Sequence, residues 1–186
     1  DPSGPGPLRR GIVNLAGNLD QPLMVANGLL QFRLDDAAHN TVRFLVNSTL
    51  GLGGVMDVAT GLGIPARPTD FGETLHVWGV PEGAYVELPL LGPSTERDLA
   101  GLIGDYALNP MRFVVPGRLS PAFTGLGVAA RLSDRAEAGE FIADILYGSA
   151  DSYAQARLLY LQNRRFRLGD TRYVDDFDPY EDPYED

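Results

Sequence analysis

The chain has 186 residues, of which 44% are apolar, and a formal net charge of −10. Seven acidic residues and no basic residue occupy the last twelve positions, so residues 1–174 carry a net charge of only −3. Nucleic-acid binding is therefore disfavoured, disorder of the whole chain is excluded by the apolar content, and disulfides, thiol catalysis and thiolate metal sites are excluded because cysteine is absent.

The composition divides the chain into two parts. We predict one helical domain over residues 1–174 and a disordered acidic tail over residues 175–186, which contains the tandem repeat DPYEDPYE. The longest uncharged stretch, residues 44–56, is shorter than the about 20 residues that a membrane-spanning helix needs. Its length suits a buried, re-entrant or interfacial segment.

Two helices are predicted near the start of the chain. Asn18 or Asp20 is expected to cap the first, with Pro22 in its first turn. Asp35 and Asp36 are expected to cap the second, whose apolar positions follow helical spacing: Val42, Leu45, Val46 and Leu50.

Shorter elements follow. Residues 53–61 predict a short helix that ends near Gly61, and a Thr69/Asp70 cap predicts another that stops at Gly79. The segment between Pro81 and Pro93 has turn residues around an extended run, which indicates a hairpin-like loop or a short ribbon. Helix then resumes after a Ser94 cap.

Two more helices are expected, over about residues 122–146 and 151–168. In the last one, four residues spaced by 4, 3 and 4 positions form one stripe: Tyr153, Arg157, Tyr160 and Arg164. The stripe could form cation–π stacks in a ligand site. We favour the simpler interpretation, in which the aromatic rings hold this helix against the body of the protein.

The glycine-rich segment at residues 47–65 does not fit a phosphate-binding loop. It has no lysine beside its glycines, as a P-loop requires, and Met56 stands where the third glycine of a dinucleotide fingerprint would be. Several glycines in apolar helical sequence instead indicate close packing of backbones or a hinge beside a cavity, because glycine costs about 1 kcal/mol relative to alanine in a helix.

No constellation of catalytic residues can be assembled. His39 and His76 each stand alone, and no G-x-S-x-G nucleophile motif occurs. Asn47-Ser48-Thr49 matches a glycosylation sequon, which is a weak signal at three residues. We therefore predict no enzyme activity, no metal and no cofactor. Short amphipathic helices rich in glycine favour a lipid-facing helical assembly over a soluble helical domain with irregular connections.

Five segments of the chain, in order, resemble the VacJ/MlaA lipoprotein family: GNLDQP, NSTLGLGGVMDVA, DFGETLHVWGV, GAYVELPLLGPSTERD and DSYAQARLLYLQNR. The resemblance implies an all-α ring of short amphipathic helices around a central channel, with a small hairpin-like loop. It further implies a non-enzymatic protein, lipid-anchored at the periplasmic face of the outer membrane. Such a protein removes phospholipids from the outer leaflet and passes them to a soluble periplasmic carrier, often beside a trimeric porin.

The resemblance also implies roles for individual residues. It places a gating loop beside the channel, at Gly79, Gly83, Tyr85, Glu87, Pro89 and Gly92. It implies that Gly51, Gly53 and Gly54 allow close packing of helices within the ring. Arg97 and Asp98 either form a polar rim of the channel or pair with neighbours at a helix start. The carrier-docking helix carries the stripe Tyr153, Arg157, Tyr160 and Arg164.

Two features depart from the family pattern. Family precursors begin with a signal peptide and a lipidated cysteine, which this sequence lacks, so we expect a processed or truncated chain. The acidic tail has no counterpart in the family signature. Two rivals remain, namely an envelope scaffold bound to a porin without conducting lipid and, less favoured, a lipid hydrolase.

Overall fold

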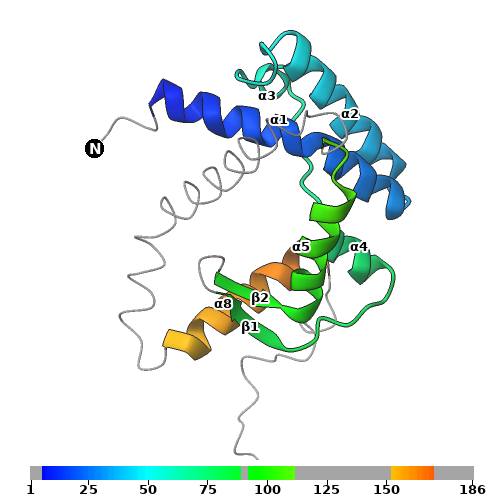
Figure 1. The fold of residues 1–186 in the computed structure, drawn as a ribbon, viewed down its shortest axis with the longest axis vertical. Helices are drawn as coiled ribbons and strands as arrows, with labels where there is room; N and C mark the ends of the chain where they lie inside the picture. Colours follow the sequence, from blue (N-terminus) through cyan, green and yellow to red (C-terminus); the bar gives the residue numbers. More distant parts are fainter. Residues whose placement is uncertain (1–5, 89–91, 112–151, 170–186) are drawn as a thin grey trace, which may run out of the picture.

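The computed structural model describes residues 6–88, 92–111 and 152–169 (Figure 1). Within them, helix dominates, in α1 (Pro7–Leu30), α2 (Leu34–Thr49), α3 (Val58–Gly61), α4 (Phe71–Val77), α5 (Glu96–Leu108) and α8 (Ser152–Arg167). Strands β1 (Tyr85–Leu88) and β2 (Gly92–Thr95) pair antiparallel. The prediction of a helical protein with a small hairpin is confirmed. The helix predicted over about 122–146 and the acidic tail lie outside the described residues.

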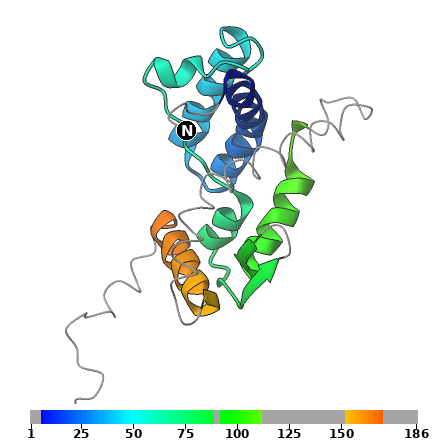
Figure 2. The ribbon, with the colours of Figure 1, turned by 90° about the vertical axis from the view of Figure 1, so that its left-hand side faces the viewer.

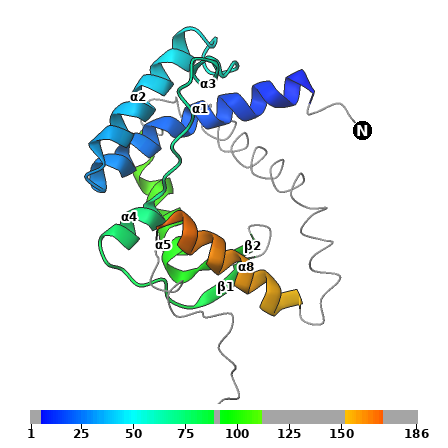
Figure 3. The ribbon, with the colours of Figure 1, turned by 180° about the vertical axis from the view of Figure 1, so that it is seen from behind.

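The described elements form two groups (Figure 1). Helices α1, α2 and α3 lie together in one group, and α4, α5, the hairpin and α8 form the other, as the side view in Figure 2 also shows. The views from opposite sides in Figures 1 and 3 agree that α8 runs beside α5 and the hairpin. Helices far apart in the sequence therefore meet in the second group.

The first helix begins earlier than predicted. It starts at Pro7, so Asn18 and Asp20 are interior positions, and Pro22 lies inside the helix instead of in its first turn. The predicted cap was wrong because Pro7 occupies the first turn of an earlier helix start. The helix continues through Pro22, since packing of α1 against α2 outweighs the loss of one backbone hydrogen bond there.

Other helix starts follow the predicted chemistry with small shifts. Asp70 accepts a hydrogen bond from the Glu73 backbone N–H and caps α4 as predicted. The α5 cap is Thr95, the last residue of β2, which accepts from the Asp98 N–H at 3.2 Å, and the predicted cap Ser94 lies one position earlier in the strand. Asp35 and Asp36 lie within the first turn of α2, where their charges favour the positive end of the helix dipole, and are not its cap.

The interior is polar. The largest fully buried side chains of the described residues are those of Asn27, Asn40, Thr74 and Thr95, and the buried apolar residues are three alanines and Leu168. In α2 the buried stripe is formed by Ala37, Asn40, Arg43 and Asn47. Three of the four apolar positions predicted for α2 face outward, Val42, Leu45 and Leu50 at 47%, 54% and 64% exposed, whereas Val46 is half-buried.

Large apolar side chains also mark the helix connections. Phe32, between α1 and α2, is 86% exposed, and Leu52, after α2, is 72% exposed. Both have a positive φ, which non-glycine residues rarely adopt. No helix in the described ranges is long and apolar enough to cross a membrane.

Candidate functional site

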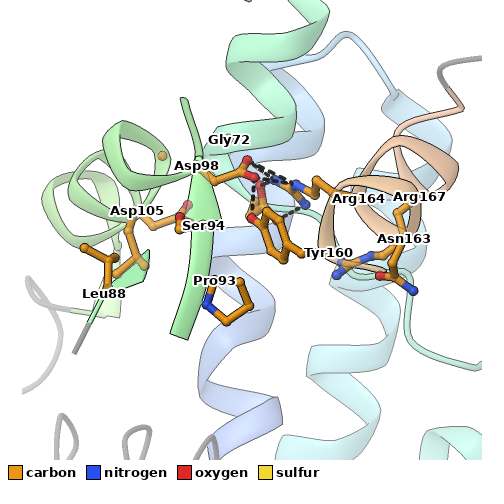
Figure 4. A pocket seen from close by; sticks show the side chains of 13 residues that line it. Gly72, Leu88, Pro93, Ser94, Asp98, Asp105, Tyr160, Asn163, Arg164 and Arg167 are labelled. Atoms are coloured by element: carbon orange, nitrogen blue, oxygen red, sulfur yellow. Dashed lines mark hydrogen bonds and ion pairs between the residues drawn. The ribbon is translucent and has the colours of Figure 1, made fainter. Parts of the chain in front are cut away.

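The centre of the second group is Arg164 of α8. Its guanidinium bonds Asp70, at the start of α4, through Nη1–Oδ2 at 2.9 Å and Nη2–Oδ1 at 2.7 Å. It also bonds Asp98 of α5, through Nη2–Oδ1 at 2.8 Å and through Nε. Since only 7% of Arg164 is exposed, these carboxylates hold it in place of water, and three helices are joined at one side chain (Figure 4).

The local charges shift the pKa values of the groups in this cluster. Burial alone would raise the pKa of Asp70, but the hydrogen bonds and charge of Arg164 outweigh it and lower that pKa. Burial, together with a 2.6 Å hydrogen bond donated to Asp98 Oδ2, raises the pKa of the Tyr160 hydroxyl. Arg164 likewise has a raised pKa, since its two carboxylate partners outweigh burial. Both Arg164 and Asp70 are therefore ionised at neutral pH.

A pocket of about 300 Å³ lies over this cluster (Figure 4). Its walls come from α4, the hairpin, α5 and α8. The lining residues are Asp70 and Gly72 at α4, Leu88, Pro93 and Ser94 of the hairpin, Asp98, Gly101, Leu102 and Asp105 of α5, and Tyr160, Asn163, Arg164 and Arg167 of α8.

Small residues let the helices of this site approach closely. A Cβ on Gly101 would meet the backbone of Gly72, and a Cβ on Gly104 would overlap the ring of Phe71. A Cβ on Gly72 would in turn meet the Asp98 and Arg164 side chains. The ion pairs of Arg164 therefore depend on glycine at a position where α4 and α5 touch.

The hairpin is anchored to α8 and α5. The ring of Tyr85 packs edge-on against Tyr153 and Tyr160, with centroids 5.5 and 6.2 Å away. Just before the hairpin, Glu82 forms an ion pair with Arg165. The predicted gating loop and the predicted last helix are therefore in direct contact.

The predicted loop residues have different surroundings. Gly79, Gly83 and Gly92 all have positive φ, of 85°, 70° and 84°, and Gly83 packs against the Glu96 side chain. Glu87 is exposed, and Pro89 lies outside the described residues. Three positive φ values around one short hairpin mean that substitution at these glycines strains the backbone.

The two residues predicted for a polar rim lie close together, with Arg97 Nε 4.0 Å from Asp98 Oδ1, but they face different surroundings. Asp98 lines the pocket, whereas Arg97 does not. Arg97 is 5% exposed, and its Nη1 lies 3.3 Å from His76 Nδ1 and 3.4 Å from the Val80 carbonyl oxygen, which it bonds. Arg97 therefore ties the start of α5 to the end of α4.

The stripe on α8 is largely used within the protein. Tyr160 and Arg164 face α5 and the start of α4, and Tyr153 contacts the hairpin, while Arg157 is exposed. This agrees with a helix held against the body by its rings. A carrier that docked on this stripe would meet Arg157 and the exposed half of Tyr153, not Arg164.

The glycine-rich segment is a packed turn. The backbone N–H groups of Gly51, Gly53 and Gly54 donate to carbonyls of Val46, Ser48 and Gly51, so these amides are not left for a phosphate. Gly54 packs directly on Asn18 of α1, and Gly51 on the backbone of α2, whereas Gly53 faces open space.

Asp57 stabilises the turn that follows. It caps α3 and accepts from Arg43 Nη2 at 2.8 Å and from Asn47 Nδ2 at 3.1 Å. Burial raises its pKa, but hydrogen bonds from Thr60, Arg43 and Asn47 outweigh that effect and lower the pKa to about 2. Asn47 is 3% exposed, so the sequon asparagine is part of the interior.

The sequence analysis did not predict the network of polar hydrogen bonds that connects the two groups of helices. Thr74 of α4 donates to Asn27 Oδ1 at 2.9 Å, and Asn27 donates to Asp105 Oδ1 at 2.9 Å. Gln31 bonds both Thr69 and Thr74. The sequence does show two amide residues, Asn27 and Gln31, near the end of one helix. They were not recognised as buried contacts because a polar stripe on a helix ordinarily faces solvent.

The fold and the site of the described residues together define a class: a helical protein with buried polar side chains, exposed large apolar side chains and a charged pocket beside a hairpin. The described residues contain no group of three or more His, Asp or Glu side chains that could hold a metal.

Comparison with known proteins gives the family. The model of the MlaA lipoprotein family matches residues 3–167. The "Intermembrane phospholipid transport system lipoprotein MlaA" of Haemophilus influenzae is 32% identical over 176 residues, 92% of this chain and 68% of the relative. The protein of that name from Shigella flexneri is 35% identical over 169 residues, 87% of this chain and 64% of the relative. The chain belongs to the MlaA lipoprotein family.

Two further similarities concern length and fold. An uncharacterized protein of Rickettsia felis is 34% identical over 77% of this chain and 57% of its own length. The chain therefore spans between 57% and 68% of the length of these three curated relatives. A chain in the solved structure described as "Structural basis for maintenance of bacterial outer membrane lipid asymmetry" matches with a TM-score of 0.74 and 32% identity, over 89% of this chain and 82% of that chain.

Proposed function

We propose that this protein moves phospholipids at the outer membrane without a chemical reaction. It takes phospholipids misplaced in the outer leaflet through a channel and passes them to a soluble periplasmic carrier. The curated relatives named as lipoproteins of an intermembrane phospholipid transport system support this proposal. The observation that carries it is the inverted burial in α1 and α2: amide side chains are buried in both helices, while Leu8 and Leu29 of α1 and Leu34 and Leu45 of α2 are each more than half exposed.

The exposed leucines are explained by the free energy of placing apolar surface against lipid instead of water. Exposed apolar surface is unfavourable in water by about 25 cal/mol per Å² and nearly neutral against acyl chains. Leu45, Leu50 and Leu52 are each more than half exposed on or just after α2. Contact with the inner leaflet of the outer membrane would cover this surface, and the polar side chains of several such helices would face a common channel. A lipid anchor and a porin alongside fit this placement.

The hairpin is the proposed gate of the channel. Its base is held by Tyr85 against α8 and by Glu82 against Arg165, whereas Gly79 precedes the hairpin and Gly92 begins β2, both with positive φ. Because no atom lies within 4 Å of where a Cβ on Gly79 would stand, the chain there can turn without a clash. Gly79 is therefore the proposed hinge where the chain leaves α4 and enters the segment that leads to the hairpin.

The first test is a photo-crosslink in a membrane. A photoreactive amino acid is placed at single positions from 79 to 92 of the protein in membranes, and adducts are identified by mass spectrometry. We expect phospholipid adducts at positions of this loop, and the same probe at Arg67, a half-exposed polar side chain paired with Asp36, is the control. Phospholipid adducts at no position of the loop would overturn the proposal.

The second test separates a gated channel from a scaffold that only binds a porin. Gly79 and Gly63 both have a positive φ, of 85° and 80°, and open space where a Cβ would stand. Alanine at either position imposes the same backbone strain, but only Gly79 borders the hairpin. A gated channel predicts that Gly79→Ala lowers lipid transport to the carrier severalfold while porin binding survives and Gly63→Ala transports normally. Equal transport by the two variants would favour the scaffold.

A further inference from the structure

The α8 wall of the pocket carries two polar side chains that the fold does not use. Asn163 and Arg167 lie one helical turn apart on α8 and both line the pocket. Among the described residues, neither side chain makes a hydrogen bond or an ion pair, although the charge of Arg167 acts on Asp70 at longer range. An amide and a guanidinium at this spacing both present N–H donors, which suits the oxygens of one phosphate group.

The opposite wall has apolar side chains beside Ser94 and Asp105. Leu88 and Pro93 of the hairpin and Leu102 of α5 line it, and Figure 4 shows Leu88 and Pro93 across the pocket from Asn163 and Arg167. The volume of about 300 Å³ is at the small end of the range for ligand sites. The pocket can therefore take a polar headgroup with part of its glycerol, and the acyl chains must leave through its open side.

The charges of the pocket restrict the kind of headgroup. Three lining residues are acids (Asp70, Asp98 and Asp105) and two are arginines, Arg164 and Arg167. The guanidinium of Arg164 is already held by Asp70 and Asp98. A headgroup with net negative charge would enter a pocket with an excess of negative charge, whereas a headgroup with its own cation would not add to that excess.

We propose that this pocket binds the zwitterionic headgroup of a phospholipid, with Asn163 and Arg167 donating to the phosphate and the acidic wall facing the ammonium group. The inference rests on the proposed function, since it gives the transported lipid a binding place and a preferred headgroup. Phosphatidylethanolamine and phosphatidylglycerol carry the same phosphodiester and differ in this cation, which makes them a direct test.

The experiment titrates the full chain with short-chain phosphatidylethanolamine and phosphatidylglycerol, below the concentration at which they form micelles. Binding is followed by calorimetry and by NMR signals of the Asn163 amide and the Arg167 Nε–H. We expect phosphatidylethanolamine to bind at least fivefold more tightly and to shift both signals. Arg167→Gln should weaken its binding about tenfold, as the loss of a charged hydrogen bond implies, and Arg167→Lys should retain most of it.

Arg157→Gln is the matched control, because it removes the same charge from the same helix at an exposed position that does not line the pocket. Two soluble probes test the source of the phosphate: glycerophosphoethanolamine, which lacks acyl chains, and inorganic phosphate. Both should bind at least tenfold more weakly than the lipid, because neither contacts the apolar wall as the lipid does.

Three results would overturn the inference. These are equal binding of the two lipids, equal effects of Arg167→Gln and Arg157→Gln, and inorganic phosphate binding as tightly as the lipid, which would identify a free-anion site. If the loop still crosslinks to phospholipid in membranes, only the headgroup site has failed. If no phospholipid binds or crosslinks anywhere, the proposed function has failed with it.

Discussion

Replacing Arg164 by methionine should destabilise the contact of α8 with α4 and α5 more than any other charge removal on α8. Methionine keeps much of the side-chain volume but leaves Asp98, whose side chain is 9% exposed, without its cation. Asp70 is 34% exposed and keeps its bond from the Glu73 N–H, so water can compensate it in part. Removing one partner of a buried ion pair typically costs about 3–5 kcal/mol, and we expect about 3–4 kcal/mol here.

The assay is urea unfolding of the protein in bicelles, combined with amide hydrogen exchange of α8. The control is Arg165→Met on the same helix, since the Arg165–Glu82 pair is about one quarter exposed on each side and should cost about 1 kcal/mol or less. Adding Asp98→Asn to Arg164→Met should restore about 1–2 kcal/mol, because the buried negative charge is removed. Equal losses for Arg164→Met and Arg165→Met, or no restoration in the double variant, would refute the reasoning.

Three further predictions concern α2 and the turn after it. Gly51→Ala should lower the free energy of unfolding by about 2 kcal/mol or more, since the added Cβ would meet backbone oxygens. Gly61→Ala is the control, because its Cβ would face open space and should change the free energy by less than about 1 kcal/mol. Urea unfolding midpoints compare the two variants. The pKa of Asp57 is lower in the folded protein than its usual 3.8, so its contribution of about 1 kcal/mol is complete above about pH 4 and is lost as the pH falls toward 2. Urea midpoints between pH 5 and 2 should therefore fall more steeply for the native chain than for Asp57→Asn, and parallel curves would contradict this. Leu45→Gln should lower binding to phospholipid vesicles severalfold without lowering the unfolding midpoint, measured by cosedimentation and urea titration; a lowered midpoint would mean that Leu45 belongs to the core.

Local signals predicted much of the fold. The carboxylate of Asp70 caps its helix, the extended run after Pro81 pairs as a hairpin, and α8 spans nearly the predicted residues, because each depends on neighbours within a few positions. The motifs in their order likewise predicted the family that the comparisons give. The start of α1 was missed because two plausible helix starts, at Pro7 and at Asn18, compete in one sequence.

Only the tertiary structure decided which face of each helix is the inside. The spacing of Val42, Leu45 and Leu50 predicted an apolar stripe, but periodicity is the same whether that stripe faces a core or lipid. The pairing of Arg164 with Asp70 and Asp98 also spans 94 and 66 positions, a separation at which no sequence spacing specifies contact. The sequence by itself therefore determined the elements and the family, because these depend on local chemistry and motif order. The polar interior and the charged pocket depend on which helices meet, and that is a property of the packed chain.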